Sequence, residues 1–478
     1  MNACITSTIR AGIVLLLVAP AFAQPLDIGT RLEPLVDDYL IDSMDNVALQ
    51  LHHPIAREIA LTTDAPWEGN TSCYVTVFQD GDLFRMYYRG SDYNVETEEH
   101  GGQRACYAES TDGIHWTKPE LGIIEYKGSK ANNIVWEGVH NFAPFKDANP
   151  DCAPEALYKA LASGPDKGLI AFQSPDGLHW SLIREEPVIT VGAFDSQNLA
   201  FWDTVRGHYV DFHRGFTDGV RAIMTATSQD FVNWTDPQWI TYTEGTPPEH
   251  LYTNATIAYP RAPHIFMAFP KRFVPDRKPV DHPVTGVSDA VFMTSRDGMQ
   301  WNRWREALVR PGLQDTRWVN RNNMTAWGIL RTKGTLPDTP DEYSLYLTEG
   351  YYVGPCHYRR FTIRQDGFVS VNAPAEGGSF TTKPLVFADD PDAKSAGEVE
   401  LVINFSTSAA GTIRIELQDE SGTPLPGHTL NDCDEIYGDA IERVVTWSGN
   451  SEVKDFAGKP VRLHVTMNEA DLYAVRFR

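Results

Sequence analysis

Short apolar runs separated by turn-forming residues recur along most of the chain. The segments 71–79, 83–89 and 104–110 are rich in aromatic and β-branched residues, and turn residues such as Asp and Gly follow each of them. Such runs predict β-strands, because branched and aromatic side chains fit a pleated surface. The spacing typical of amphipathic helices is scarce. The pattern therefore predicts an all-β protein.

One turn sequence is repeated. STDGIHW occupies residues 110–116, and variants of it occupy 174–180, 228–234, 295–301 and, more weakly, 364–370. Asp-Gly predicts a tight turn because Gly adopts positive φ without steric cost. A recurring all-β unit of this size is typical of a four-stranded propeller blade. We interpret the repeated turn as a structural corner between the third and fourth strands of a blade, with its Trp packed between neighbouring blades.

The repeats predict a five-bladed β-propeller over residues 24–375. In this interpretation the segment 121–126 is the fourth strand of the first blade, and 368–371 is the fourth strand of the last. From Glu398 onward apolar and polar residues alternate, as they do in half-buried strands. This alternation predicts a C-terminal β-sandwich over residues 376–478, a normal size for such a domain.

The first residues have the pattern of a secretory signal. Arg10 precedes a short apolar run, and Ala21, Phe22 and Ala23 form a small-x-small cleavage site. The apolar run is too short for a comfortable transmembrane span. We therefore expect residues 1–23 to be a signal peptide and the protein to be secreted or periplasmic.

Acidic residues outnumber basic ones, 64 to 41, and give a formal net charge of -23. Such a surface repels nucleic acid and anionic membranes, so neither is expected as a partner. The acidic segment 431–439 has ligands for a structural calcium ion, or else is a solvated loop, and no other cofactor is expected. The oligomeric state stays open. Five scattered cysteines outside the signal argue against a disulfide scaffold or a zinc site, although one bridge is compatible with them: Cys73, Cys106, Cys152, Cys356 and Cys433.

Four carboxylates occupy the loops that should form the rim of a propeller tunnel: Glu68, Asp195, Glu249 and Glu349. Glycoside hydrolysis needs two carboxyl groups, one protonated and one ionised. We predict Asp195 as the base or nucleophile and Glu249 as the acid, with Glu68 and Glu349 as alternatives. Each of the four is equally suited to a structural role as a hydrogen-bond acceptor. The sequence has no GxSxG, P-loop or HExxH motif for other chemistries.

Other polar residues in the same loops are predicted to bind substrate. Arg89, Arg214, Lys271 and Arg272 place positive charge on this face of an acidic protein, which favours a uronate-containing or sulfated polysaccharide. The alternative is that these cations pair with the rim acids. The remaining predicted binding residues are Asp92, His140, Asn141, Gln197, Asn198, His213, His250 and Tyr351.

The chain resembles a known family. Its S-x-D-G-x-x-W corners, five repeats and C-terminal β-domain are similar to the five-bladed propeller glycoside hydrolases, which include invertase- and levanase-like enzymes and arabinanases. The stretches LVDDYLID, PWEGN, MYYRG, AFDSQNLAFWD and EHLYTN resemble more closely the secreted bacterial proteins termed "glycosyl hydrolase family 32-like". The resemblance covers nearly all of the chain after the signal. It implies an exported glycoside hydrolase with a carbohydrate substrate.

The catalytic motifs of the invertase-like enzymes are absent. These motifs are Asn-Asp-Pro, Arg-Asp-Pro and Glu-Cys, whereas Asp147 lies in KDANP and Asn141 occupies the expected tunnel position. The resemblance therefore transfers no catalytic residue. Asp37 and Asp38 in LVDDYLID are further candidates, although this segment is equally suited to a closure strand that ends in a charged turn.

Two other functions stay open at this point. A non-catalytic glycan-binding propeller would present aromatic and amide side chains without a paired acid and base. A glycoside phosphorylase would need a basic cluster for phosphate, which Arg89, Arg214, Lys271 and Arg272 can supply.

Overall fold

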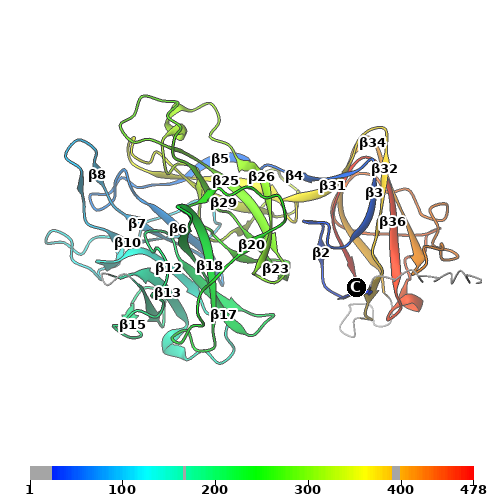
Figure 1. Cartoon of the computed structure of the whole chain (residues 1–478), viewed down its shortest axis with the longest axis horizontal. Coiled ribbons are helices and arrows are strands. Elements are labelled where there is room, and N and C mark those ends of the chain that lie inside the picture. The colour runs from blue at the N-terminus through cyan, green and yellow to red at the C-terminus, as the bar shows by residue number, and fades with distance from the viewer. Residues whose placement is uncertain (1–23, 165–167, 390–398) are drawn as a thin grey trace, which may run out of the picture.

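The computed structural model describes residues 24–164, 168–389 and 399–478, and the predicted signal peptide lies outside this part of the chain. The described residues form β-strands and three short 3-10 turns, at Pro154–Ala156, Asp315–Trp318 and Lys454–Phe456, without an α-helix. Within these ranges no helix is long and apolar enough to cross a membrane. The all-β prediction is confirmed. Figure 1 shows a propeller-like group of sheets on the left and a second group, which holds the C-terminus, on the right.

Three sheets of the propeller-like group have four antiparallel strands each, taken from consecutive parts of the chain. The first contains β6 (Cys73–Asp80), β7 (Leu83–Gly90), β10 (Arg104–Ser110) and β11 (Ile134–Glu137). The second contains β12 (His140–Lys146), β13 (Tyr158–Ser163), β14 (Leu169–Ser174) and β15 (Ser181–Leu182). The third contains β16 (Leu199–Asp203), β17 (His208–Thr217), β18 (Val220–Ser228) and β19 (Gln238–Trp239).

The fourth and fifth sheets of this group are larger, with seven and five strands. The fourth contains β20 (Thr241–Tyr242), β21 (His250–Leu251), β22 (Ile257–Tyr259), β23 (Ala262–Ala268), β24 (Lys271–Val274), β25 (Val287–Ser295) and β26 (Gln300–Val309). The fifth contains β5 (Ile55–Thr62), β27 (Met324–Thr325), β28 (Leu330–Thr332), β29 (Glu342–Glu349) and β30 (His357–Arg364). A separate ribbon pairs β8 (Tyr93–Asn94) with β9 (Glu99–His100).

Two strand predictions in this region are wrong. Residues 121–126 are a loop, and the fourth strand of the first sheet is β11. The fifth sheet is completed by β5, from before the first sheet in the chain, which pairs with β30. The predicted strand 368–371 instead belongs to β31 (Val369–Ala373), which pairs with β4 and β36. An apolar run predicts that a strand forms but does not identify its partner, which tertiary packing decides.

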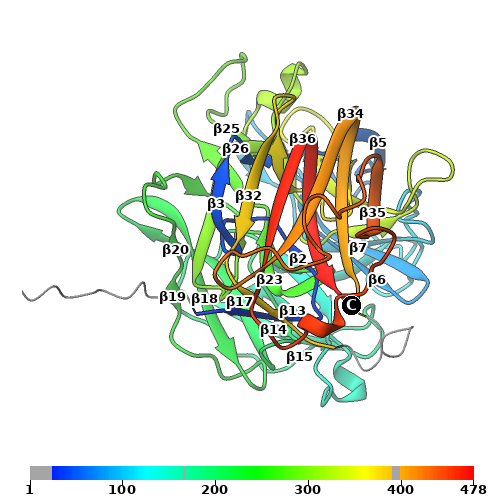
Figure 2. The ribbon, with the colours of Figure 1, turned by 90° about the vertical axis from the view of Figure 1, so that its right-hand side faces the viewer.

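The second group is one ten-stranded sheet with its own core, which includes Phe380, Ile415 and Val465. Figure 2 shows its long strands β34 and β36 from the outer side, next to β32 and β3. The ten strands are β1 (Leu26–Gly29), β2 (Glu33–Pro34), β3 (Ile41–Asp45), β4 (Ala48–Leu51), β31 (Val369–Ala373), β32 (Gly378–Thr382), β33 (Leu385–Phe387), β34 (Leu401–Asp419), β35 (Asp439–Val444) and β36 (Val461–Phe477).

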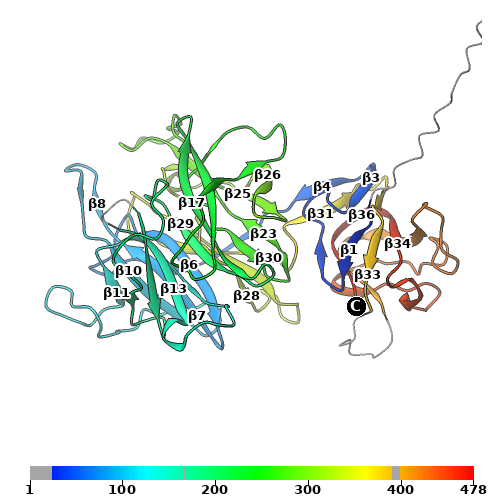
Figure 3. The same ribbon diagram turned by 60° about the horizontal axis from the view of Figure 1, so that its bottom comes forward.

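The predicted domain boundary requires a correction at the N-terminal end. The sequence assigns residues from 24 onward to the propeller, but β1 to β4 pair with strands from the end of the chain. Both ends of the chain therefore build the C-terminal sheet. Strands β4 and β31 are paired where the chain passes between the two groups (Figure 3).

The repeated turn is a self-contained corner. At Ser295 the hydroxyl accepts hydrogen bonds from the backbone N–H of Asp297 and Gly298, and Asp297 Oδ1 accepts those of the next two residues. The fully buried Trp301 donates its indole N–H to Gly298 O and packs on Phe212 of the preceding sheet. The structural interpretation of the motif is confirmed. The other corners make the equivalent contacts through Trp116 with Tyr346, Trp180 with Tyr87, and Phe231 with Phe145.

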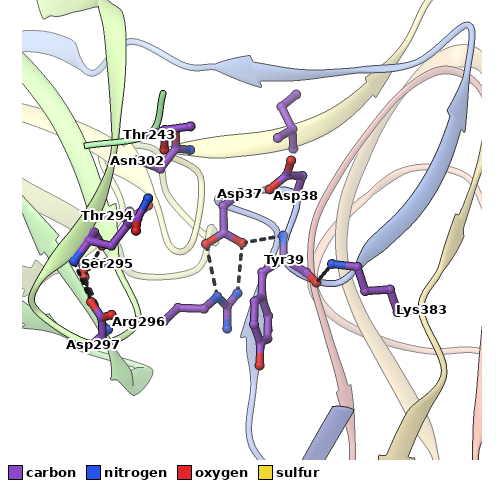
Figure 4. A pocket seen from close by; sticks show the side chains of 12 residues that line it. Asp37, Asp38, Tyr39, Thr243, Thr294, Ser295, Arg296, Asp297, Asn302 and Lys383 are labelled. Atoms are coloured by element: carbon purple, nitrogen blue, oxygen red, sulfur yellow. Dashed lines mark hydrogen bonds and ion pairs between the residues drawn. The ribbon is translucent and has the colours of Figure 1, made fainter. Parts of the chain in front are cut away.

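An ion-pair network joins the two groups of sheets beside a cleft of about 530 Å³ (Figure 4). The guanidinium of Arg296, in a propeller corner, contacts both carboxylate oxygens of Asp37 at 3.1 Å and Glu33 Oε2 at 3.0 Å. Glu33 is fully buried on β2 and also contacts Arg31 and His264. The candidate Asp37 therefore holds the two groups together.

Acid is expected to weaken this junction. Burial opposes ionisation of Glu33, but the hydrogen bond with His264 and the charge of Arg296 outweigh it and lower the pKa of Glu33 from 4.5 to about 2. A carboxylate with a depressed folded-state pKa stabilises the protein above its unfolded pKa, and this stabilisation is lost as the pH falls from 4.5 towards 2. The loss amounts to ~3 kcal/mol at 1.36 kcal/mol per pKa unit.

Urea unfolding at pH 6 and pH 3 tests this expectation. The free energy of unfolding should fall less between these pH values in Glu33→Gln than in the wild type. Asp38→Asn changes an exposed neighbouring carboxylate and should behave like the wild type. An equal loss in the wild type and Glu33→Gln would contradict the assignment.

Candidate active site

Loops from four sheets of the propeller-like group enclose a pocket of about 320 Å³, called here the central pocket. Its walls come from the end of β7, the start of β12, the loops that precede β16 and β27, and the residues after β29. These are the inner-strand entrances and second-strand exits that the sequence identifies as a rim. The lining residues are Thr71, Arg89, Ser91, His100, Gln103, His140, Asp195, Arg321 and Tyr351.

Asp195 is the one carboxylate that lines the central pocket within the described parts of the chain. Its Oδ1 lies 2.6 Å from His140 Nε2, and its Oδ2 accepts a hydrogen bond from the Tyr252 hydroxyl at 3.3 Å. The side chain is 59% exposed. Burial opposes its ionisation, but His140 and the charges of Arg321 and Arg214 outweigh burial and hold the pKa of Asp195 well below its usual range. Asp195 is therefore an ionised group that faces the pocket.

His140 holds Asp195 from the wall of the second sheet. Its Nδ1 contacts Gln103 Oε1 and lies 3.4 Å from Arg89 Nη1, so both ring nitrogens have partners. Burial and the charge of Arg89 lower the pKa of His140 despite its hydrogen bond to Asp195. A neutral His140 that donates from Nε2 to Asp195 accepts at Nδ1 from Arg89 Nη1, and its contact with Gln103 then requires the Gln103 amide to turn its NH₂ towards the ring. We infer that His140 orients Asp195.

Five cations surround Asp195 and are called here the cationic cluster: Arg89, Arg214, Arg221, Lys271 and Arg321. Within the described residues none of them lies within ion-pair distance of a carboxylate. Four of them surround the ring of Tyr252, with Lys271 Nζ at 3.9 Å and the three guanidinium carbons at 4.8–5.5 Å from its centre. The fifth, Arg89, lies 4.7 Å from the ring of Tyr74. Cation–π contacts partly compensate these charges but do not neutralise them.

Arg89 and Arg321 bring the cluster to the pocket surface. Arg89 Nη2 donates to Thr71 O at 2.8 Å, and the Tyr351 hydroxyl accepts from both Arg89 and Arg321 at 2.9 Å. The Nε atoms of both arginines have no hydrogen-bond partner in the described chain. Two guanidinium groups that share one tyrosine are positioned to bind an anion together.

Lys271 is fully buried behind this surface, and its amine has no hydrogen-bond partner in the described chain. Burial and the neighbouring charge of Arg321 hold the pKa of Lys271 well below its usual range. An unpartnered buried amine costs folding free energy. The buried cations of the cluster therefore cost folding free energy, and no carboxylate of the described residues pairs with them.

The other three predicted catalytic carboxylates do not line the central pocket. Each is engaged by cations or donors elsewhere, so the structure does not assemble the predicted acid and base pair. Glu68 contacts Tyr88, Lys118 and the backbone N–H of Ala65. Glu249 is held by Arg272 and Arg303. Glu349 is held by Arg317, His357 and Arg359.

Several predicted binding residues have structural partners instead. His213 is buried against Asp211, and the side chains of Asn141, Gln197 and Asn198 donate to backbone carbonyls. Arg272 makes a two-point ion pair with Asp289 outside the pocket. Of the remaining positions, Asp92 is exposed and His250 contacts Arg221. Arg214 is buried in the cationic cluster, where it also donates to Ala193 O.

The structure brings the predicted residues Arg89, His140, Asp195 and Tyr351 together around one pocket, and places Arg214 and Lys271 in the cationic cluster beside it. Sequence reasoning missed Arg321, Arg221 and the residues Tyr74 and Tyr252. Arg321 does lie in a loop that enters an inner strand, which is a usable signal. Tyr74 and Tyr252 carry no such signal, since buried tyrosines at strand starts are normally part of the core.

The segment considered for calcium holds its own carboxylates by local hydrogen bonds. Asp434 Oδ2 accepts from Thr446 and Gly449, and Asp432 Oδ2 accepts from Thr429. The described residues contain no cluster of three or more His, Cys, Asp or Glu side chains placed to hold a metal ion. The five cysteines in the described chain are free.

No family model and no curated protein matches the chain. Solved structures align with it at low identity. An N-acetylgalactosamine deacetylase from F. plautii, in complex with blood group B trisaccharide, is 12% identical over 67% of this chain and 96% of that chain, with a TM-score of 0.43. A structure from the GH130 family of mannoside phosphorylases, a family that contains glycoside hydrolases that target beta-1,2 mannosidic linkages in Candida mannan, is 15% identical. The alignment covers 68% of this chain and 96% of that chain, with a TM-score of 0.38.

A fructofuranosidase from Schwanniomyces occidentalis, complexed with fructosylnystose, is 12% identical over 89% of this chain and 97% of that chain, with a TM-score of 0.39. All three alignments therefore span nearly the whole of the compared protein. With TM-scores below 0.5 they assign no activity or substrate to this chain.

Proposed function

We propose that this chain is an exported carbohydrate-active enzyme that cleaves glycosidic bonds of an anionic saccharide in the central pocket. One observation carries the proposal: the pocket combines a single ionised carboxylate, Asp195, with a cationic cluster that has no carboxylate partner among the described residues. Carbohydrate as the substrate follows from the resemblance of the sequence motifs to glycoside hydrolases. We also propose that the five sheets are five blades of one ring.

Ring closure is supported by contacts between the first and fifth sheets. Val77 donates its backbone N–H to Trp327 O, and Trp327 donates to Val75 O, so the two inner strands run side by side. The corner of the first sheet packs on Tyr346 of the fifth. The second, third and fourth corners each pack on the sheet before them, and Phe368 of the weak fifth repeat packs on Phe292 of the fourth sheet, which gives one uninterrupted sequence of contacts.

In this proposal Arg89 and Arg321 bind a carboxylate or sulfate of the saccharide, and this contact sets the sugar ring against Asp195. Asp195 then accepts a proton from a water molecule whose oxygen attacks the anomeric carbon, or attacks that carbon itself. In either case the glycosidic C–O bond breaks, and the leaving oxygen takes its proton from solvent, because no second carboxyl group of the described residues lines the pocket. Both roles require an ionised carboxylate, which the low pKa of Asp195 provides. The hydrogen bond of His140 to Oδ1 orients the Asp195 carboxylate.

A second candidate is phosphorolysis. The cationic cluster suits inorganic phosphate as well as a charged sugar, and phosphate is itself a nucleophile that needs no second carboxylate to activate water. Asp195 would then have to donate a proton to the leaving oxygen. Anion binding favours this, because it offsets the charge of Arg321, one of the causes that depress the pKa of Asp195.

A panel of uronate-containing, sulfated and neutral polysaccharides, with and without phosphate, separates these possibilities. The proposal expects new reducing ends from an anionic polymer without phosphate. Release of sugar phosphate only when phosphate is present would establish phosphorolysis instead. Binding of a glycan without turnover on any polymer would show a non-catalytic glycan-binding protein and overturn the enzymatic proposal.

A further inference from the structure

A second hollow of about 540 Å³ is lined by segments that adjoin central-pocket residues along the chain, and is called here the lateral groove. It is bounded by β24, β25, the end of β26 and the residues 310–318. Nothing in the proposed reaction uses it. The groove combines exposed cations with exposed apolar side chains, which is an unusual combination on a protein of net charge -23.

The cations of the lateral groove are free to bind a ligand. The side chains of Arg277 and Arg310 are exposed and make no hydrogen bond or ion pair within the described residues, and both line the groove. Asp289, also in the lining, is already neutralised by Arg272. Glu306 is the remaining acid of the lining. The groove therefore carries an excess of positive charge.

The apolar part of the groove is fixed in orientation. Trp318 is half-buried and donates its indole N–H to Gly312 O at 2.8 Å, which holds the ring in place. Leu313 is fully exposed beside it. An oriented indole next to free guanidinium groups suits a charged sugar, because the apolar face of the sugar ring packs on the indole while its acid group pairs with Arg.

The groove and the central pocket are linked through two short segments. Trp318 in the groove precedes Arg321 in the pocket by three residues, a span of at most ~11 Å between Cα atoms even when fully extended. On β24, Lys271 belongs to the cationic cluster while Arg272 and Val274 line the groove. Because consecutive strand residues point to opposite faces, Lys271 and Arg272 lie on the two sides of β24, and the segment 318–321 joins the groove to the pocket along the chain.

We propose that the lateral groove is a second binding site for an anionic saccharide, and that it holds a further part of the polymer whose reacting unit occupies the central pocket. The polymer identity rests on the proposed function, but binding in the groove does not. The site predicts a preference for long anionic chains over short ones. Arg277, Arg310 and Trp318 carry the recognition.

Binding is tested by affinity electrophoresis of Asp195→Asn protein through gels that contain polygalacturonate, dextran sulfate or uncharged dextran. The variant Arg277→Ser/Arg310→Ser should bind at least one of the two polyanions ~10-fold more weakly, as expected for lost charge-assisted contacts. Trp318→Ala should also weaken binding. Uncharged dextran should retard none of them. The matched control is Lys130→Ser/Arg443→Ser, which removes the same charge from exposed positions elsewhere.

The outcomes are distinct. The proposed groove site is wrong if the groove variants and the wild type are retarded equally by both polyanions. It is also wrong if neither polyanion retards the wild type. Equal weakening by the control variant shows non-specific charge attraction and also overturns it. If the groove variants weaken binding but the wild type turns over no polysaccharide, the groove is a binding site and the proposed reaction is wrong. Dependence on polygalacturonate or on dextran sulfate identifies carboxylate or sulfate as the preferred group.

Discussion

Replacing Asp195 with Asn is expected to lower turnover of the anionic glycan by ~10³-fold, within the range for loss of one acid–base group. Asn has nearly the same shape and still accepts the hydrogen bond from His140, so binding should change little. The measured quantities are kcat from reducing-end release and Kd from titration of the same glycan. A loss confined to kcat indicates a group that acts on the reacting atoms.

Glu249→Gln is the matched control for this experiment. Sequence reasoning pairs Glu249 with Asp195 as the acid, whereas its carboxylate is held by Arg272 and Arg303 outside the central pocket. We expect turnover by Glu249→Gln to stay within a few-fold of the wild type. If Glu249→Gln loses as much turnover as Asp195→Asn, Glu249 acts as the acid that the sequence predicts. If Asp195→Asn keeps wild-type turnover, Asp195 takes no part in the reaction.

The strands and corners were predictable because their signals are local. The corner at Ser295 is closed by hydrogen bonds within seven residues, so STDGIHW and its variants encode it directly. The partners of β5 and β31 were not predictable. Residues 368–371 are predicted as a strand of the last blade, and no strand is predicted at 55–62; tertiary packing rather than local sequence decides where both segments pair.

The sequence predicts where the site lies but not which of its carboxylates are free to act. Rim loops identify where Arg89 and Asp195 converge, since the topology brings these loops to one face. They do not tell which acids are neutralised: Glu249 and Glu349 occupy rim positions as favourable as that of Asp195, and each pairs with an arginine more than 30 residues away, Arg303 and Arg317. Long-range pairing of this kind has no local sequence signal.

The second large effect concerns Arg321, whose replacement by Met should remove the preference for anionic glycans without a cost in stability. Arg321 donates to the Tyr351 hydroxyl, has an unpartnered Nε and lies among four other cations. A charge in such surroundings destabilises the protein when no anion is bound. Turnover of the charged glycan should fall ~10–100-fold, as for a lost charged hydrogen bond, while the melting temperature stays level or rises.

Sulfate provides an independent readout of the same site. An anion that binds only the folded state raises the melting temperature in proportion to the logarithm of its concentration over Kd. Increasing sulfate should therefore stabilise the wild type more than Arg321→Met, with sodium chloride at equal ionic strength as the control for screening. Arg321→Lys keeps the charge but not the planar fork and should give an intermediate result. If Arg321→Met instead melts earlier than the wild type and keeps the preference for charged glycans, Arg321 is a structural residue and the anionic substrate loses its main support.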